Sequence, residues 1–169
     1  MTQETTTGTG RATAPEGATA PEDAAAPETA ARTPQAGWVV VAWTPDEFGE
    51  AALDHALAAA RERGHGVAVV NGTRGDALVD DRYAAPGRLA EVAERLRATG
   101  LPHVVRQEMG RDVADQVLAV AEELDARLVV VGLRRRSPVG KLLMGSVAQR
   151  ILLTAECPVL AVKPGTAPA

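Results

Sequence analysis

The stretch Leu128-Val129-Val130-Val131-Gly132 is a short apolar run of mostly β-branched residues that ends in a glycine. A run without alternating polar residues is typical of a strand buried on both faces of a parallel sheet. Gly132 has no Cβ, so the chain is free to turn as it leaves the strand. The stretch therefore predicts an α/β protein, in which the loop after Gly132 lies at the carboxyl end of a buried strand.

Similar apolar runs recur along the chain and alternate with segments of helical spacing. The predicted strands are 38–42, 66–70, 103–107, 128–131 and 159–162, and the predicted helices are 50–63, a segment with Leu89, Val92, Ala93 and Leu96 as its stripe, 112–124 and 146–155. The strand 103–107 is more polar, which favours an edge position. Strict alternation predicts a single open parallel five-stranded sheet with helices on both faces. In such sheets ligands bind beyond the carboxyl ends of the strands.

The N-terminal part of the chain, before the first predicted strand, has a different amino-acid composition. Ala-Pro-Glu recurs with period six at 14–16, 20–22 and 26–28, and no large apolar side chain accompanies the repeats. Each proline removes a backbone donor and blocks a helix, so no packed core is expected there. We expect a disordered tail rich in Ala, Pro, Thr and Glu over 1–36, one folded domain over 37–164, and a short C-terminal tail over 165–169.

Composition excludes several classes of partner. The net charge is −4 and aromatic residues make up 2% of the chain, so neither duplex nor single-stranded nucleic acid is an expected ligand. No apolar run is long enough to span a membrane, and we expect no secretory signal at the N-terminus. The cytoplasm is the expected location. The single cysteine, Cys157, lies among apolar residues and is better explained as a small buried hydrophobe than as a reactive thiol.

The loop after Gly132 has the chemistry of an anion site. Gly145-Ser146 opens a helix whose first backbone donors have no internal partner, and a phosphate there gains those donors and the helix dipole. The loop also has four positive charges, on Arg134, Arg135, Arg136 and Lys141. It is not a Walker loop, because Leu142 follows Gly140-Lys141 where Ser or Thr is required. A solvated loop that binds no ligand is the alternative explanation.

The sequence lacks a recognisable catalytic set. His55, His65 and His103 have no metal-ligand spacing and are expected at the solvated surface. Ser146 follows a glycine, but the Gly-x-Ser-x-Gly elbow is missing. We therefore expect no catalytic residue and no metal site.

Taken together, these features resemble the universal stress protein family. Members that bind ATP have, after the fourth strand, a glycine, two residues, a second glycine, nine residues and then Gly-Ser or Gly-Thr; Gly132 and Gly145-Ser146 match the ends of this pattern, and Cys157-Pro158-Val159 matches the family's ending. The resemblance implies a Rossmann-like fold of the adenine nucleotide alpha hydrolase type. It also implies ATP or AMP as ligand, with Mg²⁺ accompanying ATP, and a homodimer formed through the last strand by Val159, Leu160 and Val162. The nucleotide-binding residues implied are Ala42, Thr44, Gly72, Val131, Gly132, Arg135, Gly145, Ser146 and Val147.

Two positions depart from the family pattern. Arg135 replaces the second loop glycine, and Thr44 stands where ATP-binding members have an aspartate, with Asp46 two residues on as a potential substitute. Three functions therefore stay open from the sequence. They are a stress-response protein that binds nucleotide, a dimeric interaction module of the same family without nucleotide, and, less favoured, an enzyme related to adenylyl transferases. The resemblance also leaves slow ATP hydrolysis open.

Overall fold

The computed structural model describes residues 37–75, 81–133 and 144–168. Its five strands form one parallel sheet in the order β3-β2-β1-β4-β5. This confirms the predicted fold, with β3 at an edge. The elements are β1 (Trp38–Ala42), α1 (Glu47–Arg63), β2 (Gly66–Thr73), α2 (Pro86–Ala98), β3 (His103–Met109), α3 (Val113–Glu123), β4 (Ala126–Gly132), α4 (Ser146–Thr154) and β5 (Val159–Val162).

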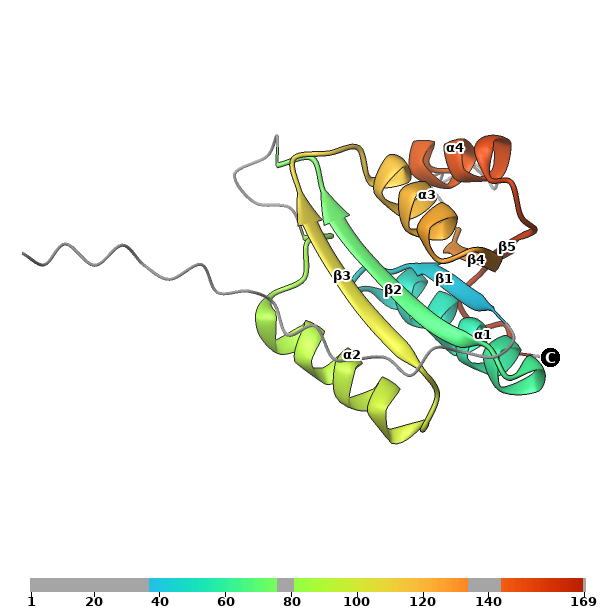
Figure 1. Ribbon diagram of the computed structural model, residues 1–169. Helices are drawn as coiled ribbons and strands as arrows, with labels where there is room; N and C mark the ends of the chain where they lie inside the picture. The colour runs from blue at the N-terminus through green and yellow to red at the C-terminus, as the bar shows by residue number, and fades with distance from the viewer. Residues whose placement is uncertain (1–36, 76–80, 134–143, 169) are drawn as a thin grey trace, which may run out of the picture.

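Helices cover both faces of the sheet (Figure 1). Because side chains alternate along a strand, β1 sends Val39 and Val41 into the core beneath α1 and α2, and Val40 into the core beneath α3 and α4. All three valines are fully buried. The continuous apolar run in β1 is therefore explained by its central place in the sheet, with a helical layer on each side.

Two boundaries differ from the predicted ones by three residues, more than any other. Helix α1 begins at Glu47 rather than at residue 50, and β2 continues through Asn71 and Gly72 to Thr73, where a loop was expected. Asn and Gly disfavour strands, but here they pair in register with the last residues of β3. The partner strand thus overrides the local preference.

The histidines were expected at the solvated surface, and for His65 this was wrong. Its side chain is 8% exposed, just past Gly64, which ends α1 in the left-handed conformation. Burial lowers the pKa of the imidazole, and the charges of Arg63 and Arg127 lower it further. His65 is therefore a neutral core residue at the end of the molecule away from the strands' carboxyl ends.

Several sequence predictions lie outside the described residues. These are the tail 1–36 and the loop residues Arg134, Arg135, Arg136 and Lys141. Among the helices described, none combines the length and apolarity needed to cross a bilayer.

Asp46 fixes the start of α1. Its Oδ1 accepts hydrogen bonds from the backbone N–H groups of Phe48 and Gly49, at 3.1 and 3.0 Å, and from the Thr44 hydroxyl at 2.7 Å. One carboxylate oxygen therefore satisfies two orphan donors of the helix and orders the turn between β1 and α1.

We expect Asp46→Ala to lower the free energy of unfolding by about 1–2 kcal/mol, because the helix loses its N-cap acceptor. Asp46→Asn retains an acceptor oxygen and should lose much less. Urea denaturation followed by circular dichroism measures both values. Equal destabilisation by the two substitutions would show that the charge, rather than the cap, is what the fold needs.

Candidate functional site

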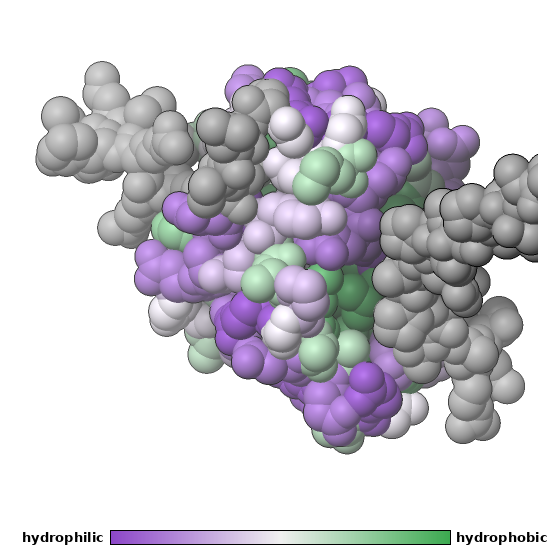
Figure 2. Space-filling model, turned by 90° about the vertical axis from the view of Figure 1, so that its left-hand side faces the viewer, coloured by the Kyte–Doolittle hydropathy of each residue, from purple (hydrophilic) through white to green (hydrophobic). Residues whose placement is uncertain are grey.

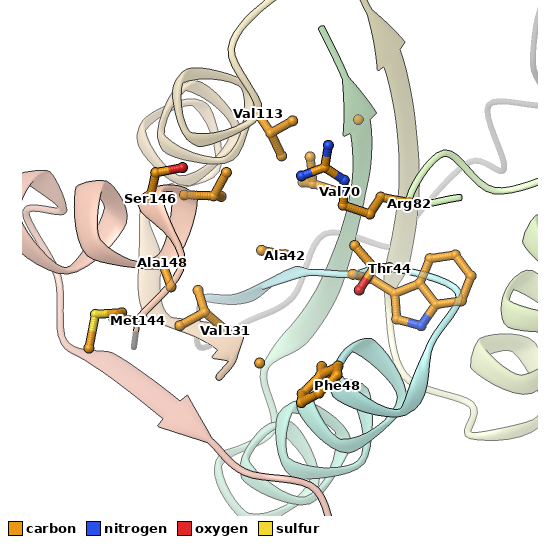
Figure 3. A pocket seen from close by; sticks show the side chains of 15 residues that line it. Ala42, Thr44, Phe48, Val70, Arg82, Val113, Val131, Met144, Ser146 and Ala148 are labelled. Carbon is orange, nitrogen blue, oxygen red and sulfur yellow. The ribbon is translucent and has the colours of Figure 1, made fainter. Parts of the chain in front are cut away.

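A cavity of about 340 Å³ opens at the carboxyl ends of β1, β2 and β4 (Figure 3). Figure 2 views the side of the molecule toward which β2 and β3 point in Figure 1, and hydrophobic residues gather there at the centre of a mainly hydrophilic surface. The lining residues are Ala42, Trp43, Thr44, Phe48, Val70, Gly72, Arg82, Val113, Val131, Gly132, Met144, Gly145, Ser146, Val147 and Ala148.

The cavity brings together eight of the nine residues that the family resemblance singled out, which are Ala42, Thr44, Gly72, Val131, Gly132, Gly145, Ser146 and Val147. They come from the ends of three strands and from the start of α4. The ninth, Arg135, lies outside the described residues. That these residues bind nucleotide stays a prediction, but their convergence on one cavity is a fact of the fold.

Two of the cavity glycines are required by close packing. A Cβ on Gly132 would lie 2.4 Å from the Phe48 carbonyl oxygen, so glycine lets β4 end directly against the first turn of α1. A Cβ on Gly72 would lie 1.9 Å from Oε1 of Gln116, a side chain only 1% exposed. Packing within the protein therefore explains both glycines, independently of any ligand.

Gly145 is different. It precedes α4 with φ −63° and ψ 149°, a conformation open to any residue, and a Cβ there would meet no described atom within 4 Å. As the N-cap residue it supplies no side-chain acceptor, so among the described residues no side chain caps the first N–H groups of α4. Neither packing nor backbone strain within the described chain explains this glycine. A glycine with open space at a helix N-terminus is what close approach of a ligand phosphate requires.

Thr44 faces the cavity as a hydrogen-bond acceptor. Its hydroxyl proton is donated to Asp46, which leaves oxygen lone pairs for a donor in the cavity. The potential substitute, Asp46, is not among the described lining residues, and its Oδ1 caps α1. Thr44 therefore presents an acceptor at the end of β1, but without the charge of a carboxylate.

Arg82 was not predicted from the sequence, and its side chain points into the cavity (Figure 3). The Arg82 backbone carbonyl accepts a hydrogen bond of 2.8 Å from the amide of Asn71. No periodicity marks the segment between β2 and α2, and Asn71 was expected in a loop. The signal available was a buried-strand position occupied by an asparagine, which is a polar side chain that needs partners.

Other residues singled out from the sequence do not reach the cavity. His55, His65, His103 and Cys157 are absent from its described lining. Cys157 is partly exposed, and burial raises the pKa of its thiol, in keeping with a packing role. In the part of the chain that the structure describes, no three His, Cys, Asp or Glu side chains are grouped to hold a metal ion.

An ion-pair cluster joins α3 to α4 beside the cavity. Asp112 caps α3 by accepting from the N–H of Ala114, and it pairs with Arg74 from beyond β2 and with Arg150 of α4. Arg150 also pairs with Asp115 at 2.6 Å. The hydrogen bond from Arg74 lowers the pKa of Asp112, and the Ala114 N–H and the charge of Arg150 act in the same direction. The cluster holds the middle of α4 against the start of α3.

A doubly wound parallel sheet with a cavity at its carboxyl edge defines a class of ligand-binding α/β domains. The model of the Universal stress protein family matches residues 38–163. A universal stress protein of Mycolicibacterium smegmatis is 47% identical over 126 residues, which cover 75% of this chain and 97% of that protein. The chain therefore belongs to the universal stress protein family.

Solved structures support the same assignment. A universal stress protein from Archaeoglobus fulgidus is 32% identical, with a TM-score of 0.63 over 76% of this chain and 98% of that one. A structure of the universal stress protein from Archaeoglobus fulgidus in complex with dAMP is 26% identical, with a TM-score of 0.53 and the same coverage of both chains. The sheet order and the helical layers described above are thus those of the family.

The lowered pKa of Asp112 predicts a pH-dependent contribution to stability. As the pH falls, the unfolded chain takes up the proton first, at about pH 4, while the folded carboxylate stays ionised to lower pH. The contribution is therefore complete above about pH 4 and is lost as the pH falls through the folded pKa. Asp112→Asn keeps a capping oxygen but removes the charge.

We expect wild type to melt above Asp112→Asn at pH 7, and the gap to narrow below about pH 4. Thermal unfolding by circular dichroism between pH 3 and pH 7 measures it. Because His65 is present in both proteins, its titration cancels in the difference. A gap that stays constant over this range would contradict a role for the Asp112 charge.

Proposed function

We propose that this protein is a stress-response protein that binds an adenine mononucleotide, AMP or ATP, in the cavity at the carboxyl edge of its sheet. The observation that carries the proposal is the unexplained glycine, Gly145, at an uncapped helix N-terminus that lines the cavity. The first N–H groups of α4 and the helix dipole suit a phosphate. Ser146 adds a hydroxyl at the same point.

The rest of the cavity suits a nucleoside. The apolar side chains of Ala42, Val70 and Val131 line it, and Thr44 presents an acceptor to a hydroxyl or amino group. A volume of about 340 Å³ falls within the range of small-molecule sites. The dAMP complex of the Archaeoglobus fulgidus relative supports this ligand class. Mg²⁺ would enter with ATP, held by its phosphates, and Arg135 is proposed to contribute positive charge at the same loop.

We propose binding rather than catalysis as the role of the cavity. Among its described lining residues, Arg82 is the one titratable side chain, and an arginine stays protonated in proteins. The described lining thus supplies hydroxyls and backbone donors but no general base. Nucleotide occupancy would then act by changing the surface that the protein presents in the cytoplasm.

We propose that the protein forms a homodimer through the open edge of β5. In the described chain β5 pairs with β4 alone, which leaves its outer edge open, and Leu160 is 38% exposed there. Leu153 of the adjoining α4 is 79% exposed. Val162, which was expected at the interface, is buried beneath α1, so it would contribute through its backbone. Pairing of two β5 edges would cover this apolar surface.

The nucleotide proposal predicts that protein purified under native conditions releases adenine nucleotide on denaturation. Gly145→Val should abolish this and should weaken binding of added AMP or ATP by at least tenfold, because the side chain fills the space before α4. The fold should persist, since no described atom lies near the new side chain, although a β-branched N-cap costs about 1 kcal/mol. Chromatography of the released molecules and titration calorimetry measure these effects.

Gly87→Val is the matched control, because Gly87 lies in the first turn of α2, has no described atom near its Cβ and is not among the described lining residues of the cavity. It should leave nucleotide binding unchanged. If wild-type protein releases no nucleotide and millimolar ATP produces no thermal shift, the cavity is not a nucleotide site and the family's role as an interaction module is favoured.

The dimer proposal predicts that Leu160→Asp converts the protein to a monomer, because it buries two like charges at a paired strand edge. Light scattering after size exclusion gives the mass. Met109→Asp is the control at the opposite edge of the sheet, where Met109 is 58% exposed, and it should stay dimeric. A monomeric wild type, or a dimer that survives Leu160→Asp, argues against β5 as the interface.

A further inference from the structure

We infer that Arg82 is the base contact of this cavity, stacking its planar guanidinium on the purine of the bound nucleotide. The inference rests on the nucleotide-binding function proposed above and assigns a role to a residue that the family's glycine pattern does not include. It follows from where Arg82 lies, from what surrounds its guanidinium, and from how its backbone is held.

Arg82 and the start of α4 lie on opposite sides of the cavity. In Figure 3 the Arg82 side chain enters from the segment before α2 and ends beside Val70 and Val113, while Ser146 and Met144 lie across the opening. A phosphate bound at the α4 N-terminus fixes one end of a nucleotide. The other end, which is the base, then extends across the cavity toward Val70 and Arg82.

The lining of the cavity suits a flat apolar ligand group. Val70, Val113 and the aromatic ring of Phe48 line the same cavity as the Arg82 side chain. Guanidinium is planar and weakly hydrated, so it stacks on π-systems in a way that an ammonium group does not. A base that rests on these apolar residues presents a face to the Arg82 plane.

The backbone of Arg82 is anchored by a fully used buried amide. Asn71 is 0% exposed, and its Nδ2 donates to the carbonyls of Arg82 and Trp43, at 2.8 and 3.1 Å. Its Oδ1 accepts from the Ala84 N–H and from Nε2 of Gln107, both at 3.0 Å. An asparagine amide has two donor hydrogens and two acceptor lone pairs, and all four are used.

This anchoring joins four parts of the chain at one point. Asn71 belongs to β2, Gln107 to β3 and Trp43 to the end of β1, and the segment before α2 is fixed to all three. Gln107 also donates to the Ala84 carbonyl at 2.9 Å. The starting point of the Arg82 side chain is therefore set before a ligand arrives, which reduces the ordering cost of a stacking contact.

The test compares three ligands and three proteins by titration calorimetry. The ligands are AMP, adenosine and ribose 5-phosphate, and the proteins are wild type, Arg82→Lys and Arg82→Ala. We expect both substitutions to weaken AMP and adenosine by about tenfold and to leave ribose 5-phosphate within about twofold. Arg82→Lys is decisive, because it keeps the positive charge and removes the plane.

Arg97→Ala is the matched control, because Arg97 is an exposed arginine on α2 that pairs with Glu94 away from the cavity. It should bind all three ligands as wild type does. Melting temperatures of every variant, measured without ligand, separate a binding defect from a folding defect.

Three results would overturn the inference. Loss of AMP and ribose 5-phosphate binding with adenosine unchanged would make Arg82 a phosphate contact. Wild-type affinities in both Arg82 variants would show that the base does not touch it. If wild type binds none of the three ligands and no ATP, the proposed function fails, and the base contact fails with it.

Discussion

The structure depends on the point in the sheet where the chain reverses its direction of travel. Strands β1, β2 and β3 follow one another toward one edge, and the chain then returns to add β4 and β5 on the other side of β1. Because parallel crossovers are right-handed, the helices after the reversal cover the opposite face. The helix α1 that follows β1 and the helix α4 that follows β4 therefore diverge to opposite faces, and the gap between their starts is the cavity.

Much of this could be predicted from local sequence. Strand segments buried on both faces, such as Val39–Val41 of β1 and Val129–Val131 of β4, need unbroken runs of β-branched residues, and that pattern is strong enough to fix the number and order of the elements. Gly145-Ser146 could be found because a helix start after a glycine has a recognisable form. Eight cavity residues were predicted because the family resemblance implied them, and in the structure each lies near a strand end or at a helix start.

What could not be predicted depends on contacts between distant segments. Asn71 resembles a loop residue until Gln107 and the segment at Ala84 are brought beside it. The backbone of Arg82 is held by the Asn71 side chain, so Arg82 could not be placed at the cavity before the position of Asn71 was known. His65 was expected at the surface, since nothing in its neighbours along the chain reveals that it is buried just past Gly64 at the end of α1. The side chain of Asn71 is held by hydrogen bonds to residues 11 to 36 positions away, which local sequence cannot show.

The N-termini of α1 and α4 at the cavity differ in their capping, and this difference determines how a ligand would be oriented in the site. At α1 the carboxylate of Asp46 already occupies the N-terminus and, through Thr44, presents acceptors to the cavity. At α4 the N-cap is Gly145, without a side-chain acceptor. A ligand phosphate is repelled by the negative charge at the first helix and attracted by the open donors at the second. For the nucleotide proposed here, the phosphate must therefore lie at α4, and the nucleoside, whose hydroxyl and amino groups are donors, must extend toward Thr44 and Arg82.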